Sequence, residues 1–259
     1  MDLEILQSLL LENFIVTVKY SPVELLSKLE QVETPVEYFQ FYNSVSSVYS
    51  SKIEGENIDF DSFFKHKFMN VQYQPDYTKK ADDLFLAYEF IFKNKLNLDN
   101  LKQAHSILSS NLLPKSQQGF VRTNPMFVIN SDDRIEYVAA EPEKIITALN
   151  KLFYDIDKLI KVELTDYETF YYASFIHLVF VKIHPFQDGN GRAARLLEKW
   201  FLITKLGEKA TAVQLEKNYF KNLSDYYSNI KKLGKDYETL DYSKALDFLC
   251  MTAKGLQDQ

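Results

Sequence analysis

Apolar residues recur three and four positions apart along most of this chain, which is the spacing of amphipathic helices. Segments with this spacing are bounded by proline, glycine or capping residues; they are 3–14, 35–53, 59–68, 76–93, 98–113 and 142–160, with another helix from 189 or 190 to 206. Two or three more helices are expected near residues 212–233 and 242–253. The pattern predicts a protein built mainly from helices.

Two helices have recognisable start signals. Thr34 is followed by Pro35 and, three residues on, by a glutamate, so a capping box and an N1 proline together predict a helix start at about residue 35. Thr165 and Glu168 form a second capping box. The helix over residues 166–183 is apolar nearly all round, so we expect it to be central and buried.

One segment breaks the helical pattern. The β-prone runs 127–129 and 135–138 flank the polar run 130–134, which predicts a small β-hairpin. The chain has no Pro/Gly/Ser-rich linker, internal repeat or low-complexity stretch. We therefore expect one compact, all-α domain that carries a hairpin.

Composition limits the classes of function. A net charge of −6 gives no chain-wide electrostatic case for nucleic-acid binding. The single cysteine, Cys250, excludes an intramolecular disulfide framework. Residues 2 and 4 are acidic where a signal peptide is basic, and no apolar run is long enough to span a bilayer. We expect a soluble, cytoplasmic protein that binds neither membrane nor nucleic acid.

The densest chemistry lies in residues 184–195, which read His-Pro-Phe-Gln-Asp-Gly-Asn-Gly-Arg-Ala-Ala-Arg. Two of the chain's four arginines, Arg192 and Arg195, lie three apart and so share a helix face. The planar guanidinium binds phosphate oxygens in pairs, which the ammonium of lysine does not do. This end of the segment favours a polyphosphate ligand.

The rest of the segment adds an anion nest, an acid and a base. Gly189, Asn190 and Gly191 open a helix, where free backbone N–H groups and the positive dipole end favour an anion. The Asp188 carboxylate can hold Mg²⁺ that bridges phosphate oxygens, and His184 can accept a proton from a hydroxyl. Each feature alone is also typical of a turn, cap or loop. Their order and spacing together favour a phosphate-transfer site.

Position for position, this segment resembles the signature of the Fic family, His-x-Phe-x-Asp/Glu-Gly-Asn-Gly-Arg-x-x-Arg. The resemblance extends over roughly residues 98–233: the apolar helix with His177 leads into the motif, and residues 119–122 with the hairpin resemble the family's flap. It implies an all-α, Fic-type helical bundle with a small β-hairpin flap. It also implies transfer of AMP from ATP, with Mg²⁺, to a Ser, Thr or Tyr hydroxyl of a target protein.

The resemblance assigns roles around the loop. His184 would be the general base for the target hydroxyl, and Asp188 would bind Mg²⁺. Gly189, Asn190 and Gly191 would cradle the α-phosphate, with Asn190 also helping through its side chain. This arrangement implies that the nucleotide lies across the start of the helix that follows the motif.

The same resemblance assigns the arginines and the flap. Arg192 would hold the β-phosphate and Arg195 the γ-phosphate. The flap, about residues 126–138, would register the target segment by β-strand addition. Its target-docking residues would be Met126, Phe127, Val128 and Ile129.

A second candidate motif lies far upstream. Glu54 is at the C-terminal end of a predicted helix, where the macrodipole disfavours an acid, and Ser50 shares its face. On local pattern alone this is a solvated glutamate beside a helix-ending glycine, Gly55. The sequence also resembles the inhibitory helix motif of autoinhibited Fic proteins, Ser/Thr-x-x-x-Glu-Gly/Asn. The implied role is a salt bridge from Glu54 to Arg195 that blocks the γ-phosphate position.

The resemblance implies three regions and leaves several functions open. Residues 1–95 would form an N-terminal helical region with the inhibitory helix at about 35–55, residues 96–235 the Fic core, and residues 236–259 a C-terminal helix on the same domain. Alternatives to an adenylyltransferase are another phosphate-group transferase or a de-AMPylase on this fold, or a non-catalytic ATP-binding interaction module. Gly191 favours nucleotidyl transfer, because the phosphorylating branch of the family has a lysine there.

The expected partners are a protein substrate, which could be this chain itself, and a second copy in a homodimer.

The remaining candidate residues have weaker signals. His66 and His105 have no acid or cysteine at ligand spacing, so we expect surface or core histidines. An adenine pocket could be lined by Tyr219, Tyr226 and Tyr227.

Overall fold

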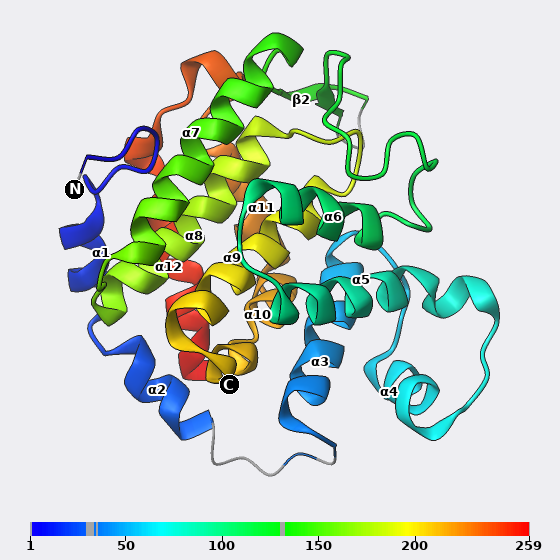
Figure 1. The fold of residues 1–259 in the computed structure, drawn as a ribbon. Coiled ribbons are helices and arrows are strands. Elements are labelled where there is room, and N and C mark those ends of the chain that lie inside the picture. The colour runs from blue at the N-terminus through cyan, green and yellow to red at the C-terminus, as the bar shows by residue number, and fades with distance from the viewer. Residues whose placement is uncertain (1, 30–33, 35, 130–132, 259) are drawn as a thin grey trace.

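The computed structural model describes residues 2–29, 34, 36–129 and 133–258, and it is helical apart from one hairpin and the connecting loops (Figure 1). The helices of this part of the chain are α1 Leu11–Val18, α2 Pro22–Leu29, α3 Tyr38–Ile53, α4 Phe60–Met69, α5 Pro75–Lys93, α6 Leu98–Leu108, α7 Pro142–Lys161, α8 Asp166–Ile183, α9 Asn190–Leu206, α10 Leu215–Lys221, α11 Leu223–Lys231 and α12 Leu246–Gly255. The predicted all-α class with a small hairpin is confirmed. Among these helices, none is long and apolar enough to cross a membrane.

The centre of the molecule is α8, which packs against α1, α7, α9 and α12 (Figure 1). Most of its side chains are buried, because apolar residues cover every face of the helix. Its start is the predicted capping box: the Thr165 hydroxyl accepts the Glu168 N–H, and Glu168 accepts the Thr165 N–H. This rigid helix carries the first residues of the candidate site.

The candidate inhibitory helix, α3, packs against α4, α5 and α10. It begins at Tyr38, later than predicted, and the Thr34 hydroxyl donates to the Val36 carbonyl instead of capping a helix. Pro35 lies outside the described residues. At the other end Gly55 has φ +85°, its N–H bonds the Lys52 carbonyl, and the next N–H reaches back to Ser51. This glycine-based ending turns the chain sharply after Glu54.

The predicted helix over residues 3–14 was wrong. Helix α1 begins only at Leu11. The backbone before it is held by a side chain from another helix. The buried carboxylate of Asp155 on α7 accepts the N–H groups of Glu4, Ile5 and Leu6 at 2.7–2.8 Å. An acid far along the chain therefore satisfies the backbone donors of an irregular segment. The helix α2, opened by Pro22, was not predicted.

Other boundaries differ by a turn or more. Helix α6 ends at Leu108, five residues earlier than predicted, and continues as turns. The expected helix near 212–233 is split into α10 and α11 at Asn222, after a short 3₁₀ turn at Glu208–Ala212. The last predicted helix is a 3₁₀ turn, Tyr242–Lys244, followed by α12.

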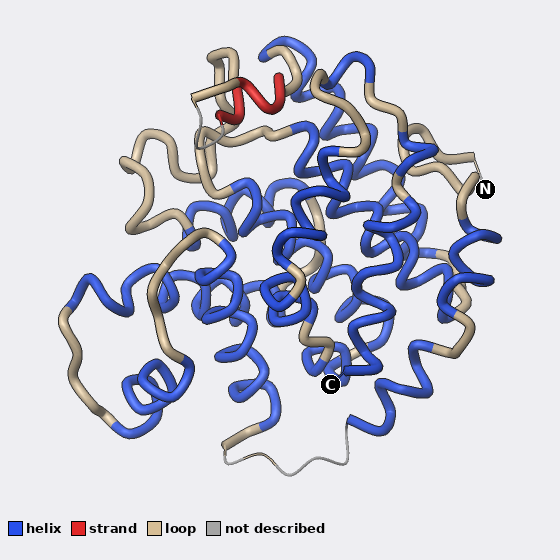
Figure 2. Tube along the Cα trace, turned by 180° about the vertical axis from the view of Figure 1, so that it is seen from behind, coloured by secondary structure: helices blue, strands red, loops and turns tan. Residues whose placement is uncertain are grey.

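The hairpin consists of β1 Phe127–Ile129 and β2 Ile135–Val138, as the sequence predicted. The strands are antiparallel, with Phe127 opposite Val138 and Ile129 opposite Ile135. Residues 130–132 of the predicted turn lie outside the described residues. Seen from behind, the hairpin lies at the edge of the helical body, beside loops (Figure 2).

Candidate active site

The loop after α8 is closed on itself. His184 takes a left-handed conformation, φ 55° and ψ 58°, that ends the helix, and Gly189 takes φ 77° just before α9. Phe186 is fully buried and anchors the loop. Asn190 Oδ1 accepts the Phe186 N–H at 2.9 Å, and Asn190 Nδ2 donates to the Phe186 carbonyl at 2.8 Å. The Asn190 side chain thus holds the loop in shape.

A buried histidine supports this loop from below. His105 Nδ1 accepts the Gly119 N–H at 2.9 Å, so its Nε2–H donates to the Asp188 carbonyl, also at 2.9 Å. The ring stacks on Phe186 with centroids 3.6 Å apart, and burial lowers the pKa of His105 to about 4. The sequence placed His105 only as a core or surface histidine. Its support of the loop could not be found, because the contact spans 83 residues.

The flap base is tied to the loop by Arg122. Its guanidinium is buried and donates to three carbonyl groups, those of His184, Asn124 and Ala140, at 2.6–2.8 Å. The Arg122 N–H also bonds the Pro185 carbonyl at 2.9 Å. One side chain therefore sets the hairpin at a fixed position over the loop.

His184 is held in one tautomer. Its Nδ1 lies 3.1 Å from the Val181 carbonyl, which can only accept, so Nδ1 carries the proton and Nε2 is left as an acceptor. Burial lowers the pKa of His184, and the nearby charge of Arg122 lowers it further; the Val181 carbonyl and the acids Asp188 and Glu54 only partly oppose this. The ring is therefore a neutral base at neutral pH.

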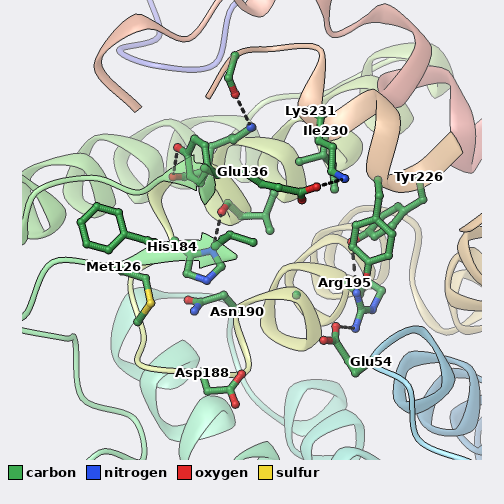
Figure 3. Close-up of a pocket in the computed structure, with 18 of the residues that line it drawn as sticks. Glu54, Met126, Glu136, His184, Asp188, Asn190, Arg195, Tyr226, Ile230 and Lys231 are labelled. Carbon is green, nitrogen blue, oxygen red and sulfur yellow. Dashed lines mark hydrogen bonds and ion pairs between the residues drawn. The ribbon is translucent and has the colours of Figure 1, made fainter. Parts of the chain in front are cut away.

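A cavity of about 390 Å³ lies beside His184, between the start of α9, the hairpin and α11. In Figure 3, His184, Asn190 and Asp188 lie on one side, and Arg195 and Glu54 lie on the other. The hairpin contributes lining residues that include Met126, Phe127, Val128, Glu136 and Tyr137. Ile129, the fourth expected flap residue, is 61% exposed and does not line the cavity.

The carboxylate of Glu54 sits at the first turn of α9. Glu54 Oε1 lies 2.6 Å from Arg195 Nη2, and a Cβ added at Gly191 would come within 2.6 Å of the same oxygen. Burial raises the pKa of the Glu54 carboxyl, but the charges of Arg195 and Arg192 outweigh it, so the net shift is downward. An anion already occupies the position that the helix start and Arg195 create.

Arg195 is buried and nearly saturated with acceptors. Nε donates to the Ser50 hydroxyl at 3.0 Å, Nη2 donates to the Ser50 carbonyl at 3.2 Å, and Nη1 donates to the Tyr226 hydroxyl at 3.2 Å. With the Glu54 contact, four interactions hold one guanidinium. The candidate inhibitory residues Ser50 and Glu54 therefore meet Arg195, while Gly55 shapes the turn beside them.

Arg192 is placed differently from expectation. It does not line the cavity; its Nη2 lies 3.6 Å from Glu56, which also pairs with Lys80 at 2.5 Å. Among the described residues its buried Nε has no hydrogen-bond partner. The structure thus brings Arg195, and not Arg192, to the cavity wall.

Asp188 fits a magnesium ion shared with phosphates. Its side chain is exposed at the cavity edge, where one oxygen accepts the Gly189 N–H at 2.6 Å. The described part of the chain holds no group of three or more acidic, histidine or cysteine side chains that could bind a metal alone. Mg²⁺ commonly takes one or two carboxylates and completes its shell with phosphate and water oxygens. The donor set suits a metal that arrives with a nucleotide.

The far end of the cavity holds a buried lysine that the sequence did not single out. Lys182 Nζ donates to the Gly234 carbonyl at 3.2 Å and lies 4.1 Å from the centre of the Tyr137 ring. Burial lowers the pKa of Lys182 to about 8. Of the three tyrosines suggested for an adenine pocket, Tyr226 and Tyr227 line the cavity and Tyr219 is buried behind it.

Comparison with known proteins gives one family match. Residues 95–202 match the model of the Fic/DOC family, which covers α6, the hairpin, α7, α8 and most of α9. This match contains the loop, His184, the nest at the start of α9 and both arginines. No curated protein matches the chain in sequence.

Solved structures of Fic proteins share the fold. A Fic family protein from Desulfovibrio desulfuricans G20 has a TM-score of 0.78 at 17% identity, with 100% of this chain and 76% of that chain covered. A Fic domain containing signaling protein from Bacteroides thetaiotaomicron VPI-5482 has a TM-score of 0.61 at 17% identity, with 96% of each chain covered. Fic-1 (aa134 - 508) from C. elegans has a TM-score of 0.67 at 15% identity, with 97% of this chain and 72% of that chain covered.

Proposed function

We propose, from the match of residues 95–202 to the Fic/DOC family model, that the chain is a protein adenylyltransferase held inactive by Glu54. Domains of this family transfer phosphate-linked groups such as AMP to proteins. The observation that carries the proposal is a neutral histidine and an anion site facing one cavity. His184 has a free acceptor nitrogen, and a carboxylate paired with Arg195 already lies at the start of α9.

The reaction follows from these positions. With ATP across the start of α9, the N–H groups of Asn190 and Gly191 would face the α-phosphate, joined by that of Gly189 when it leaves Asp188 Oδ1, and Arg195 would face the γ-phosphate. A hydroxyl of the target protein attacks the α-phosphorus while His184 Nε2 takes its proton. The bond from the α-phosphorus to the bridging oxygen breaks, and pyrophosphate leaves. Mg²⁺ on Asp188 would supply charge neutralisation for the phosphates.

The space above Gly191 supports nucleotidyl transfer over phosphorylation. A side chain at this position would collide with a group seated on the helix start, as the 2.6 Å approach to Glu54 shows. Glycine therefore leaves room for an α-phosphate in the nest. The hairpin, held over the cavity by Arg122, is suited to align an extended target segment.

The inhibited state follows from competition for Arg195. Glu54 is a charge-assisted partner at 2.6 Å, on the side where the γ-phosphate would bind. ATP can enter the nest but cannot gain the Arg195 contact until this pair opens. Removal of AMP from a modified target by the same site remains the second candidate, since Glu54 is an ionised acid beside the nest.

The test uses Glu54→Gly with Mg²⁺ and ATP labelled at either the α- or the γ-phosphate, in the presence of cell lysate. Label from the α-phosphate alone on protein is the expected result. Label from the γ-phosphate would show a phosphotransferase, and nucleotide binding without label on protein would show a binding module. Loss of AMP from a pre-modified target with the wild-type chain would show the removal activity.

A further inference from the structure

On the side of Arg195 away from Glu54, three buried side chains connect α9 to its neighbours. Tyr226 on α11 accepts from Arg195 Nη1 at 3.2 Å, and its hydroxyl lies 3.0 Å from His177 Nε2 on α8. His177 Nδ1 lies 2.7 Å from Glu198, which is on α9 one turn after Arg195. All of these side chains except Glu54 are at most 1% exposed. We call Tyr226, His177 and Glu198 the relay.

The hydrogen bonds of the relay have a single consistent direction. A guanidinium only donates, so the Tyr226 oxygen accepts from Arg195 and its own proton goes to His177 Nε2. Burial lowers the pKa of His177, so the ring is neutral and its Nδ1–H donates to Glu198. Glu198 is fixed by further hydroxyl donors, which are Ser174, Tyr219 and Thr252. The series ends in a carboxylate that is itself held on every side.

Arg195 is therefore held by two groups of contacts that differ in origin. The contacts with Ser50 and Glu54 come from α3 and its end, and the Glu54 contact must be broken before a phosphate can replace it. The contact with Tyr226 comes from α11 and is independent of Glu54. A flexible side chain left with fewer partners loses orientation, which weakens any paired contact with phosphate.

Resting on the proposed function, we propose that the relay positions Arg195 for the terminal phosphate once Glu54 withdraws. Tyr226 is the positioning residue in contact with the guanidinium, and His177 and Glu198 act through it. The relay also places a buried negative charge one turn from a buried positive one on α9, which offsets the cost of burying both. Nucleotide selection for the triphosphate would then depend on residues outside the signature motif.

The test is the preference for ATP over ADP, because only ATP carries the γ-phosphate. Dissociation constants are measured by titration calorimetry with Mg²⁺ in Glu54→Gly/His184→Ala, a background designed to bind without turnover. Adding Tyr226→Phe should weaken ATP binding by about 3-fold to 10-fold and leave ADP binding unchanged, which is the effect of losing one hydrogen bond. Tyr171→Phe is the matched control, since its buried hydroxyl bonds the Gln7 carbonyl at 2.6 Å, away from Arg195 and the relay.

His177→Gln should act in the same direction, and combining it with Tyr226→Phe should add little, because both belong to one series. The His177→Gln variant alone can test the proposal if Tyr226→Phe unfolds, which a thermal melt would show. An unchanged ATP preference in the Tyr226 and His177 variants overturns the proposal, and so does an equal loss in Tyr171→Phe. If the background variant itself does not prefer ATP, the γ-phosphate role of Arg195 fails first, and the relay proposal fails with it.

Discussion

At the scale of single residues, one hydrogen bond sets the chemistry of the site. The Val181 carbonyl takes the Nδ1 proton of His184 and leaves Nε2 as a free acceptor beside the cavity. Arg195 has the opposite character, since its donors are taken up by Ser50, Glu54 and Tyr226. Under the proposed function, His184 would therefore be ready to accept a proton, while the phosphate contact of Arg195 would be blocked.

His184→Ala in the Glu54→Gly background should lower AMP transfer by about 10²-fold to 10⁴-fold, the usual contribution of a general base. ATP binding should stay close to that of the parent, because His184 is placed against the acceptor hydroxyl and not against the phosphates. Incorporation of α-phosphate label and a binding titration measure the two effects. His66→Ala is the control, because this histidine contacts Asp82 outside the cavity. Near-parental transfer by the His184 variant would show that His184 is not the general base.

The lowered pKa of His184 predicts the pH profile of transfer. The active form is the neutral ring, so the rate should stay level as the pH falls from about 8 to 6.5 and decline only below the ordinary histidine value. Single-turnover labelling by Glu54→Gly across this range measures it, with no titration of Glu54 to complicate the result. A half-maximal rate at pH 6.5 or above would mean that the ring is not shielded as the structure shows.

At the scale of elements, one contact between distant parts of the chain decides what the local pattern could not. Apolar spacing over residues 3–14 predicted a helix, but Asp155 satisfies the backbone of the first part and α1 starts later. The hairpin strands, by contrast, were predicted at their observed bounds, since alternation and turn residues are local signals. Helix α3 was predicted from a capping box and an N1 proline, with a start three residues too early.

Asp155→Ala should lower the free energy of unfolding by about 2–4 kcal/mol, because three backbone donors lose a charged acceptor in a partly buried place. Denaturant unfolding measures the change, and limited proteolysis should show earlier cleavage within the first ten residues. Asp157→Ala is the control on the same helix, where an exposed carboxylate pairs only with Lys161. Equal effects of the two variants would show that Asp155 does not anchor the N-terminal segment.

At the scale of the whole molecule, the sequence could predict a contiguous candidate site but not its surroundings. Residues 184–195 could be interpreted from the sequence because the loop and the first turn of α9 are contiguous. The position of Arg192 against Glu56, the support by His105, and the relay depend on side chains that meet only when the helices pack. Sequence periodicity predicts which face of each helix is buried. It does not predict which polar side chains from distant helices meet in the interior.

Self-modification by four proteins at saturating Mg²⁺-ATP tests the central claim, that Glu54 holds the site inactive through Arg195. Mass spectrometry of attached AMP should give a strong signal for Glu54→Gly and little for the wild type. Glu56→Gly should stay low, because Arg195 keeps its partner at 2.6 Å. Arg195→Ala should also stay low, since it breaks the block but removes the γ-phosphate contact. Equal, low modification in the wild type and Glu54→Gly would contradict the account.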